Sequence, residues 1–192
     1  MAKRNMTPID RPSMDEVYIE FAKIVARRSV CQRRRQVGCV ITNWNKTNVV
    51  AIGYNGPARS LPHDCRPDVP QVLTPPVPGE MLPPDVVRGE PSPGSCTCVH
   101  AEANALIKAP YDQGKLRLYT TTSPCEACSR LILNSRVEEV IYADLYRKME
   151  GLYILAIAGV FFRGIDEGSI DYRREYDFTF PNGETFYRVP PR

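Results

Sequence analysis

Four residues in two short segments have the types and the spacing of a catalytic metal site. His100 and Glu102 stand two positions apart, and Cys125 and Cys128 stand three positions apart. An imidazole and two thiolates give zinc three protein ligands and leave the fourth tetrahedral position for water, as in catalytic zinc sites. Zinc lowers the pKa of bound water from about 16 to about 7, so hydroxide is available at neutral pH. Glu102 is not expected to bind the metal, and its carboxylate is free to carry protons.

The two segments, His-Ala-Glu at 100–102 and Pro-Cys-Glu-Ala-Cys at 124–128, match the signature of zinc deaminases. In that chemistry the hydroxide attacks C4 of a cytosine ring. The glutamate takes a proton from the water, passes it to N3 and later protonates the departing amine. The alternative is a closed structural zinc site in which a spare cysteine occupies the fourth position. The His-x-Glu segment and the proline before Cys125 favour the catalytic interpretation.

The elements that must position these segments follow from hydrophobic periodicity. Ser13 followed by Glu16 is a capping-box pattern. The apolar residues behind it recur at helical spacing and predict a helix to about Arg28; they are Val17, Phe21, Ile24 and Val25. Two apolar runs with β-branched residues, 37–42 and 49–54, then predict a hairpin.

Beyond residue 100 helices and strands alternate. We expect helices over 101–108, 125–134 and 148–158, and strands over 116–122, 139–143 and 160–162. This alternation predicts an α/β fold in which helices cover a sheet. Asn182-Gly183 between alternating segments predicts a C-terminal hairpin.

One domain is expected over residues 1–192. It contains an insertion loop at 61–95, where ten of the eighteen prolines lie between Pro62 and Pro93, and a C-terminal extension at 163–192.

Composition narrows the function classes. The chain has 192 residues, 43% of them hydrophobic, and no apolar run long enough to span a membrane. The first eleven residues lack the apolar core of a secretory signal, so we expect a cytoplasmic protein. A net charge of +3 argues against a nucleic-acid partner and suits a small anionic substrate. Seven cysteines in an intracellular chain indicate metal binding or catalysis.

Four further segments, at 28–31, 36–41, 53–56 and 61–63, carry a resemblance to the deoxycytidylate deaminase family. The resemblance runs from about Ser13 to Phe162, and the Gly-x-Asn-Gly element at 53–56 is the most discriminating part. It implies a cytidine deaminase-like three-layer α/β/α fold with a central mixed five-stranded sheet. It also implies hydrolysis of dCMP to dUMP for thymidylate synthesis, a homo-oligomer that is often a hexamer, and regulation by dCTP and dTTP with Mg²⁺.

The same resemblance assigns roles to individual residues. His100, Cys125 and Cys128 are the expected ligands of a catalytic Zn²⁺, and Glu102 is the expected proton shuttle. The candidate substrate contacts are Asn55, Ala101, Ser123, Tyr146 and Arg34, and the candidate effector contacts are Gly53, Asn55 and Gly56. Asn55 can instead be a plain turn residue and Tyr146 a core residue. Any of the arginines at 33–35 can hold the 5′-phosphate, or the cluster is a solvated surface.

Some relatives carry a second, structural zinc, and four residues of this chain fall at similar positions: Cys31, His63, Cys65 and Cys96. Four nitrogen and sulfur ligands make a closed tetrahedral site. Either His63 or Cys65 can be the ligand of that segment, and Cys98 can replace Cys96. The alternative is a set of buried free thiols with a surface histidine. We expect Cys39, in a predicted strand, to be a core residue.

Two other function classes remain open at this point. One is a deaminase for dCTP, free cytidine, guanine or an adenosine in tRNA. The other is a zinc-dependent nucleotide sensor without catalysis, which would have no use for the proton shuttle Glu102.

Overall fold

The computed structural model describes residues 11–31, 35–59, 98–112 and 114–166, and the backbone of two short strands at 178–179 and 185–186. The helices within these ranges are α1 (Met14–Ala26), α2 (Ala101–Leu106), α3 (Glu126–Leu133) and α4 (Glu150–Ile157). The strands are β1 (Gly38–Asn43), β2 (Val49–Tyr54), β3 (Gly56–Pro57), β4 (Cys98–Val99), β5 (Leu116–Thr122), β6 (Val137–Asp144), β7 (Phe161–Gly164), β8 (Phe178–Thr179) and β9 (Thr185–Phe186). None of the described helices is long and apolar enough to cross a bilayer.

A mixed five-stranded sheet in the order β2-β1-β5-β6-β7 forms the centre of the fold. β1 is antiparallel to both β2 and β5, whereas β5, β6 and β7 run parallel. Two small pairs lie outside it. β3 pairs with β4 just before His100, and β8 pairs antiparallel with β9. The predicted mixed sheet, the hairpin of β1 and β2 and the C-terminal hairpin are therefore confirmed.

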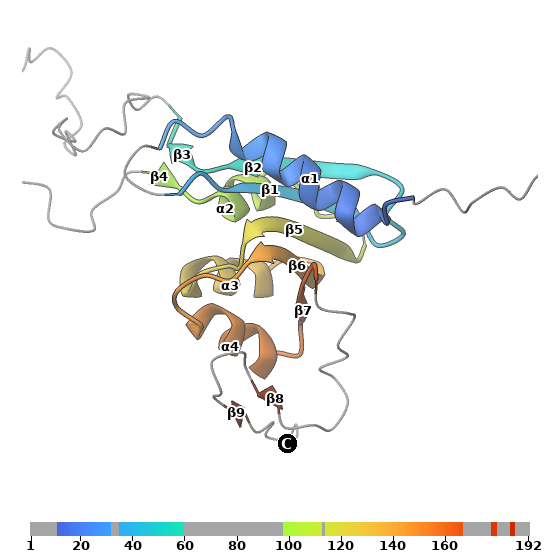
Figure 1. Cartoon of the computed structure of the whole chain (residues 1–192), viewed down its shortest axis with the longest axis vertical. Coiled ribbons are helices and arrows are strands. Elements are labelled where there is room, and N and C mark those ends of the chain that lie inside the picture. The colour runs from blue at the N-terminus through green and yellow to red at the C-terminus, as the bar shows by residue number, and fades with distance from the viewer. Residues whose placement is uncertain are drawn as a thin grey trace, which may run out of the picture.

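Helices cover both faces of this sheet, which makes the predicted three layers (Figure 1). α1 packs on one face against Val40, Tyr119 and Ile141 of successive strands. The other three helices pack on the opposite face around Leu118 and Val140. This second face carries both metal-binding segments.

The capping box of α1 is present as predicted, but the stripe that faces the sheet differs from the apolar periodicity. Val17 is 41% and Ile24 is 59% exposed, whereas Tyr18, Ile19, Ala22 and Val25 are buried. Glycine is required at 38, where β1 approaches this helix: a Cβ on Gly38 would lie 2.0 Å from the Ala22 carbonyl oxygen. Of the predicted apolar stripe, Val25 therefore faces the sheet, whereas Val17 and Ile24 do not.

A network of buried charges lies where β5 and β6 begin, at the end of the sheet away from the metal-binding segments. Asp15 accepts hydrogen bonds from Lys46 at 2.8 Å and from Arg163 at 2.5 Å. Glu139 accepts from Arg163 at 3.3 Å and also pairs with Arg117. Each carboxylate meets two cations, and the network joins α1, the β1–β2 turn and the three parallel strands.

Candidate active site

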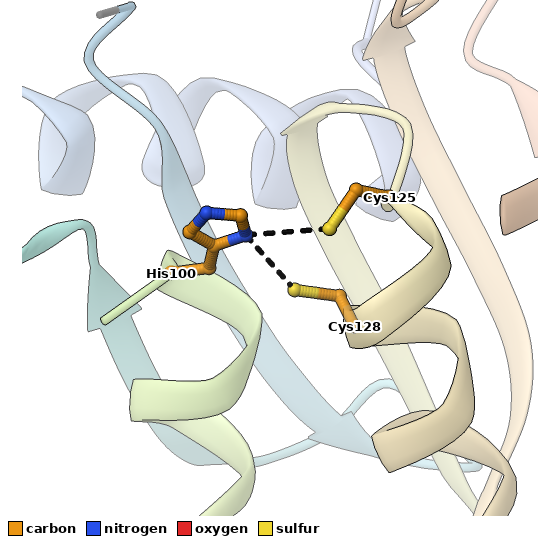
Figure 2. Close-up of side chains that lie close together, drawn as sticks. All are labelled: His100, Cys125 and Cys128. Carbon is orange, nitrogen blue, oxygen red and sulfur yellow. Dashed lines mark hydrogen bonds between the residues drawn. The ribbon is translucent and has the colours of Figure 1, made fainter. Parts of the chain in front are cut away.

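His100, Cys125 and Cys128 come together between α2 and α3. Nδ1 of His100 lies 3.3 Å from Sγ of Cys125 and 3.4 Å from Sγ of Cys128. Figure 2 shows the imidazole facing both sulfur atoms. One ligand atom from each residue lies within 4.8 Å of the other two. His100 is the N-cap of α2 and Cys125 is the N-cap of α3. The predicted helix began at Cys125, whereas α3 begins at Glu126, so Cys125 stands just before the first helical turn.

These separations fit a zinc ion. Zinc–sulfur bonds of about 2.3 Å and zinc–nitrogen bonds of about 2.0 Å in a tetrahedron put the ligand atoms about 3.6 Å apart. The two nitrogen–sulfur distances are within 0.3 Å of that edge. Among the described residues the group has three members, so the fourth tetrahedral position is left for water or substrate.

Two glycines let the surrounding elements close on the site. A Cβ on Gly53 of β2 would lie 2.2 Å from the carbonyl oxygen of Ala101, and a Cβ on Gly151 of α4 would lie 2.1 Å from that of Pro124. Real Cβ atoms do not approach so closely, so any larger residue would displace the backbone beside a ligand. Gly53, a candidate effector contact in the sequence, therefore has a packing role against α2.

Glu102 follows His100 by two residues and is 4% exposed. Burial raises the pKa of its carboxyl to about 6, although a backbone hydrogen bond and the nearby imidazole act in the opposite direction. A carboxyl group with a pKa near neutrality can both accept and donate a proton at physiological pH. The position and the chemistry both suit the predicted proton shuttle.

The two thiols differ in acidity. A hydrogen bond from Cys128, assisted by His100, lowers the pKa of Cys125 to about 3 despite partial burial. The same hydrogen bond and burial raise the pKa of Cys128 well above its ordinary value. Cys125 is therefore a thiolate at neutral pH, which is the form that binds metal.

Four of the predicted substrate contacts lie in the described part of the chain, namely Ala101, Ser123, Tyr146 and Asn55. Ala101 and Ser123 are buried, and each is adjacent to a metal-binding segment. Tyr146 is half-buried, and its backbone N–H donates to Oγ of Ser123 at 2.8 Å. Asn55 is 6% exposed, and its side chain binds the backbone of the segment just before β1. Its Oδ1 accepts a hydrogen bond from the Val37 N–H at 2.7 Å. Its Nδ2 donates to the Arg35 carbonyl at 3.1 Å.

Several predicted residues lie outside the described ranges, namely Arg34, His63, Cys65 and Cys96. Cys31 is described and is 3% exposed. Cys39 is fully buried in β1, as expected of a core residue, and burial raises the pKa of its thiol well above the ordinary value.

Two interactions at this end of the sheet could not be predicted from the sequence. Asn104 of α2 donates from Nδ2 to the Tyr54 carbonyl at 2.9 Å. Arg35 forms an ion pair with Asp144 at the end of β6. The spacing of four between His100 and Asn104 places both on one helix face, but it does not indicate what Asn104 contacts.

Comparison with known proteins extends these observations. Residues 12–144 match the cytidine and deoxycytidylate deaminase zinc-binding region. The chain is 34% identical over 161 residues to the deoxycytidylate deaminase of Saccharomyces cerevisiae, covering 82% of this chain and 46% of that protein. It thus spans about half the length of that relative.

A viral relative and a solved structure match over nearly their whole lengths. The deoxycytidylate deaminase of Mycobacterium phage D29 is 38% identical over 138 residues, which are 70% of this chain and 97% of that protein. The dCMP deaminase of cyanophage S-TIM5, solved with dCMP and dUMP, is 25% identical with a TM-score of 0.60. That match covers 81% of this chain and 98% of the cyanophage chain.

Proposed function

This chain belongs to the cytidine and deoxycytidylate deaminase family, and from that premise we propose that it hydrolyses dCMP to dUMP and ammonia. The observation that carries the proposal is the buried carboxyl of Glu102 beside a cluster of three metal ligands. Three ligands leave a position for chemistry, and a purely structural site has no need of a buried proton carrier. The full-length similarity to the phage D29 enzyme supports dCMP as substrate.

Bound zinc would supply a Lewis acid that makes water reactive at neutral pH. The chain's own contribution is proton transfer by Glu102. Its carboxylate takes a proton from the attacking water and delivers it to N3 of the cytosine ring while the oxygen bonds to C4. The remaining water proton then passes through Glu102 to the amino nitrogen. The C4–N bond breaks, a C4 carbonyl forms, and ammonia leaves.

The substrate contacts are proposed from position. Ala101 directly follows the ligand His100, and Ser123 stands two positions before the ligand Cys125. Both are proposed to contact the base, because its C4 must meet the reacting water beside these ligands. Asn55 retains one N–H and one lone pair after its two backbone hydrogen bonds, so it can still bind the sugar or phosphate. Tyr146 follows the strand that ends beside Ser123 and is proposed as an aromatic neighbour of the base.

The 5′-phosphate is proposed to bind the arginine cluster at 33–35, with Arg34 as the primary contact. Its neighbour Arg35 is half exposed at this end of the sheet and pairs with Asp144. An anion there would meet guanidinium groups that can bind phosphate oxygens in a bidentate manner.

The proposal includes a second, structural Zn²⁺ held by Cys31, Cys96 and one or both of His63 and Cys65. A buried Cys31 supports it, because thiolate ligands of structural zinc are shielded from solvent. We further propose a homo-oligomer, with a hexamer favoured, regulated by dCTP and dTTP with Mg²⁺ through the Gly53, Asn55 and Gly56 segment. A cytoplasmic location is proposed because the thiol ligands must remain reduced.

The direct test measures ammonia release and loss of cytosine absorbance with dCMP, dCTP and deoxycytidine in parallel, with bound zinc counted on the same sample. Turnover of dCMP with two zinc ions per chain is the expected result. Turnover of dCTP alone would support the deamination mechanism but replace dCMP by dCTP as the substrate. A zinc-loaded chain that binds these nucleotides without turnover would overturn the proposal in favour of a sensor.

A further inference from the structure

Asn104 joins the helix of the zinc ligand His100 to the segment that ends β2. Its Nδ2 donates to the Tyr54 carbonyl at 2.9 Å and to the Val99 carbonyl at 3.4 Å. The backbone N–H of Asn104 donates to the carbonyl of His100, so the same residue belongs to the first turn of α2. The start of α2 and the end of β2 are therefore connected through one partly buried side chain.

The connection continues to the predicted nucleotide-binding residues. Tyr54 directly precedes Asn55, whose backbone N–H donates to the Val37 carbonyl at 3.1 Å. The Asn55 side chain binds the same segment through Val37 and Arg35. A shift of the Tyr54 carbonyl would thus move Asn55 and the segment that carries the arginines.

Arg35, in the segment that Asn55 binds, is also connected to the metal-binding segment that contains Cys125. Arg35 pairs with Asp144, and the Asp144 carbonyl accepts from the Ser123 N–H at 2.8 Å. Ser123 lies two positions before the ligand Cys125. These hydrogen bonds and the ion pair therefore connect the helix of His100, through the segment of Arg35 and Val37, to the residues just before Cys125.

We propose that Asn104 is a positioning residue that sets the loop of Asn55 relative to the zinc ligands and so determines how tightly the nucleotide binds. The inference rests on the proposed deaminase function. Close packing of Gly53 against Ala101 and Ala105 holds α2 on β2 independently of this side chain. Loss of the Asn104 amide should consequently loosen the loop and leave the metal site and Glu102 in place.

Lys108 provides a matched control. It lies four residues after Asn104, just past the end of α2, and its Nζ donates to the Ile52 carbonyl at 3.3 Å. Both side chains thus bind carbonyls of β2 from the same side, but only Asn104 reaches the end next to Asn55. If Asn104 acted only by attaching α2 to β2, substitution of Lys108 would weaken nucleotide binding as much as substitution of Asn104.

The test compares Asn104→Asp, Asn104→Ala and Lys108→Met in the full-length protein. Aspartate keeps the size of Asn104 and replaces the donor with an oxygen that faces two carbonyls. Loss of a hydrogen bond of this kind should raise KM for dCMP roughly tenfold, with kcat changed less than about threefold. Zinc content should stay at the wild-type value in both Asn104 variants. Lys108→Met should match wild type in KM, kcat and zinc content.

Amide hydrogen exchange gives a readout that needs no turnover. The amides of Val37 and Asn55 should exchange roughly tenfold faster in both Asn104 variants and remain protected in Lys108→Met. Unchanged protection in both variants, or loss of zinc, or a fall in kcat with constant KM, would overturn the positioning role. If the wild-type protein turned over no cytosine nucleotide, the proposed function would be wrong. The amide exchange rates would still show whether Asn104 holds the loop of Asn55 in place.

Discussion

Nδ1 of His100 lies 3.3 Å from Sγ of Cys125, and each of these residues is the N-cap of its helix. Both have extended backbones, and neither side chain caps the helix it begins. Side chains at N-caps usually accept hydrogen bonds from the first turn. Here they point away from it and toward each other, so the geometry that starts α2 and α3 also creates the metal site.

The first prediction concerns the proton shuttle. Glu102→Gln should reduce kcat for dCMP about a thousandfold, because the amide can neither take nor deliver the proton. Zinc content and nucleotide binding should be retained, since Glu102 is not a metal ligand. Glu126→Gln is the matched control, because Glu126 lies beside the ligand Cys125 but is exposed and paired with Arg130. Residual activity near the wild-type value in Glu102→Gln would exclude this mechanism.

Removal of the metal should expose a reactive thiol. After chelation, Cys125 should be alkylated first at pH 6, because its lowered pKa keeps it as a thiolate. Cys39 should remain unmodified in the folded protein, since it is buried and its pKa is raised. Mass spectrometry of the alkylated peptides checks both expectations, and zinc should protect Cys125. Equal labelling of the two cysteines would contradict the assigned acidities.

The buried charge network predicts a pH-dependent stability. Burial raises the pKa of Asp15, but hydrogen bonds from Lys46, Tyr119 and Arg163 outweigh burial and hold the pKa below its ordinary value. The carboxylate therefore stabilises the fold above the unfolded-state pKa, and this stabilisation is lost as the pH falls through the lower folded-state value.

Asp15→Asn should lower the free energy of unfolding at pH 7 by about 3 kcal/mol, because it removes a carboxylate partner from the buried Arg163 and from the partly buried Lys46. The difference from wild type should shrink below about pH 4. Urea titrations between pH 3 and pH 7 measure it. Glu20→Gln, which removes an exposed pair with Lys23, should change the stability by less than about 0.5 kcal/mol at any pH. A pH-independent deficit in Asp15→Asn would contradict the linkage.

The close approach of α4 predicts that Gly151→Ala weakens zinc binding. The new Cβ would have to avoid the Pro124 carbonyl oxygen and the backbone of Cys125, so the start of α3 must shift. We expect a loss of about 2 kcal/mol in stability and a clear rise in the zinc dissociation constant. Gly159→Ala, at a positive φ with open space around it, should cost about 1 kcal/mol and leave zinc affinity unchanged. Isothermal titration of the apo variants distinguishes the two effects.

Much of the architecture was predictable from local patterns. The boundaries of β2 and β5 agree with the predicted runs to the residue, because short runs rich in apolar and β-branched side chains are typical of strands. The buried face of α1 was not predictable. Of the predicted stripe Val25 is buried but Val17 and Ile24 are exposed, because the buried face depends on which strands the helix meets in the folded chain.

The metal ligands and Glu102 were determined by the sequence itself, because zinc coordination and proton transfer depend on residue types that few other roles require. The hydrogen bonds among the segments beside the metal ligands were decided by tertiary structure alone. Asn104 binds the carbonyl of Tyr54, and Asn55 binds the backbone at Arg35 and Val37. Every residue offers the same carbonyl oxygen, so such partners leave no trace in the sequence and are selected only when the chain has folded.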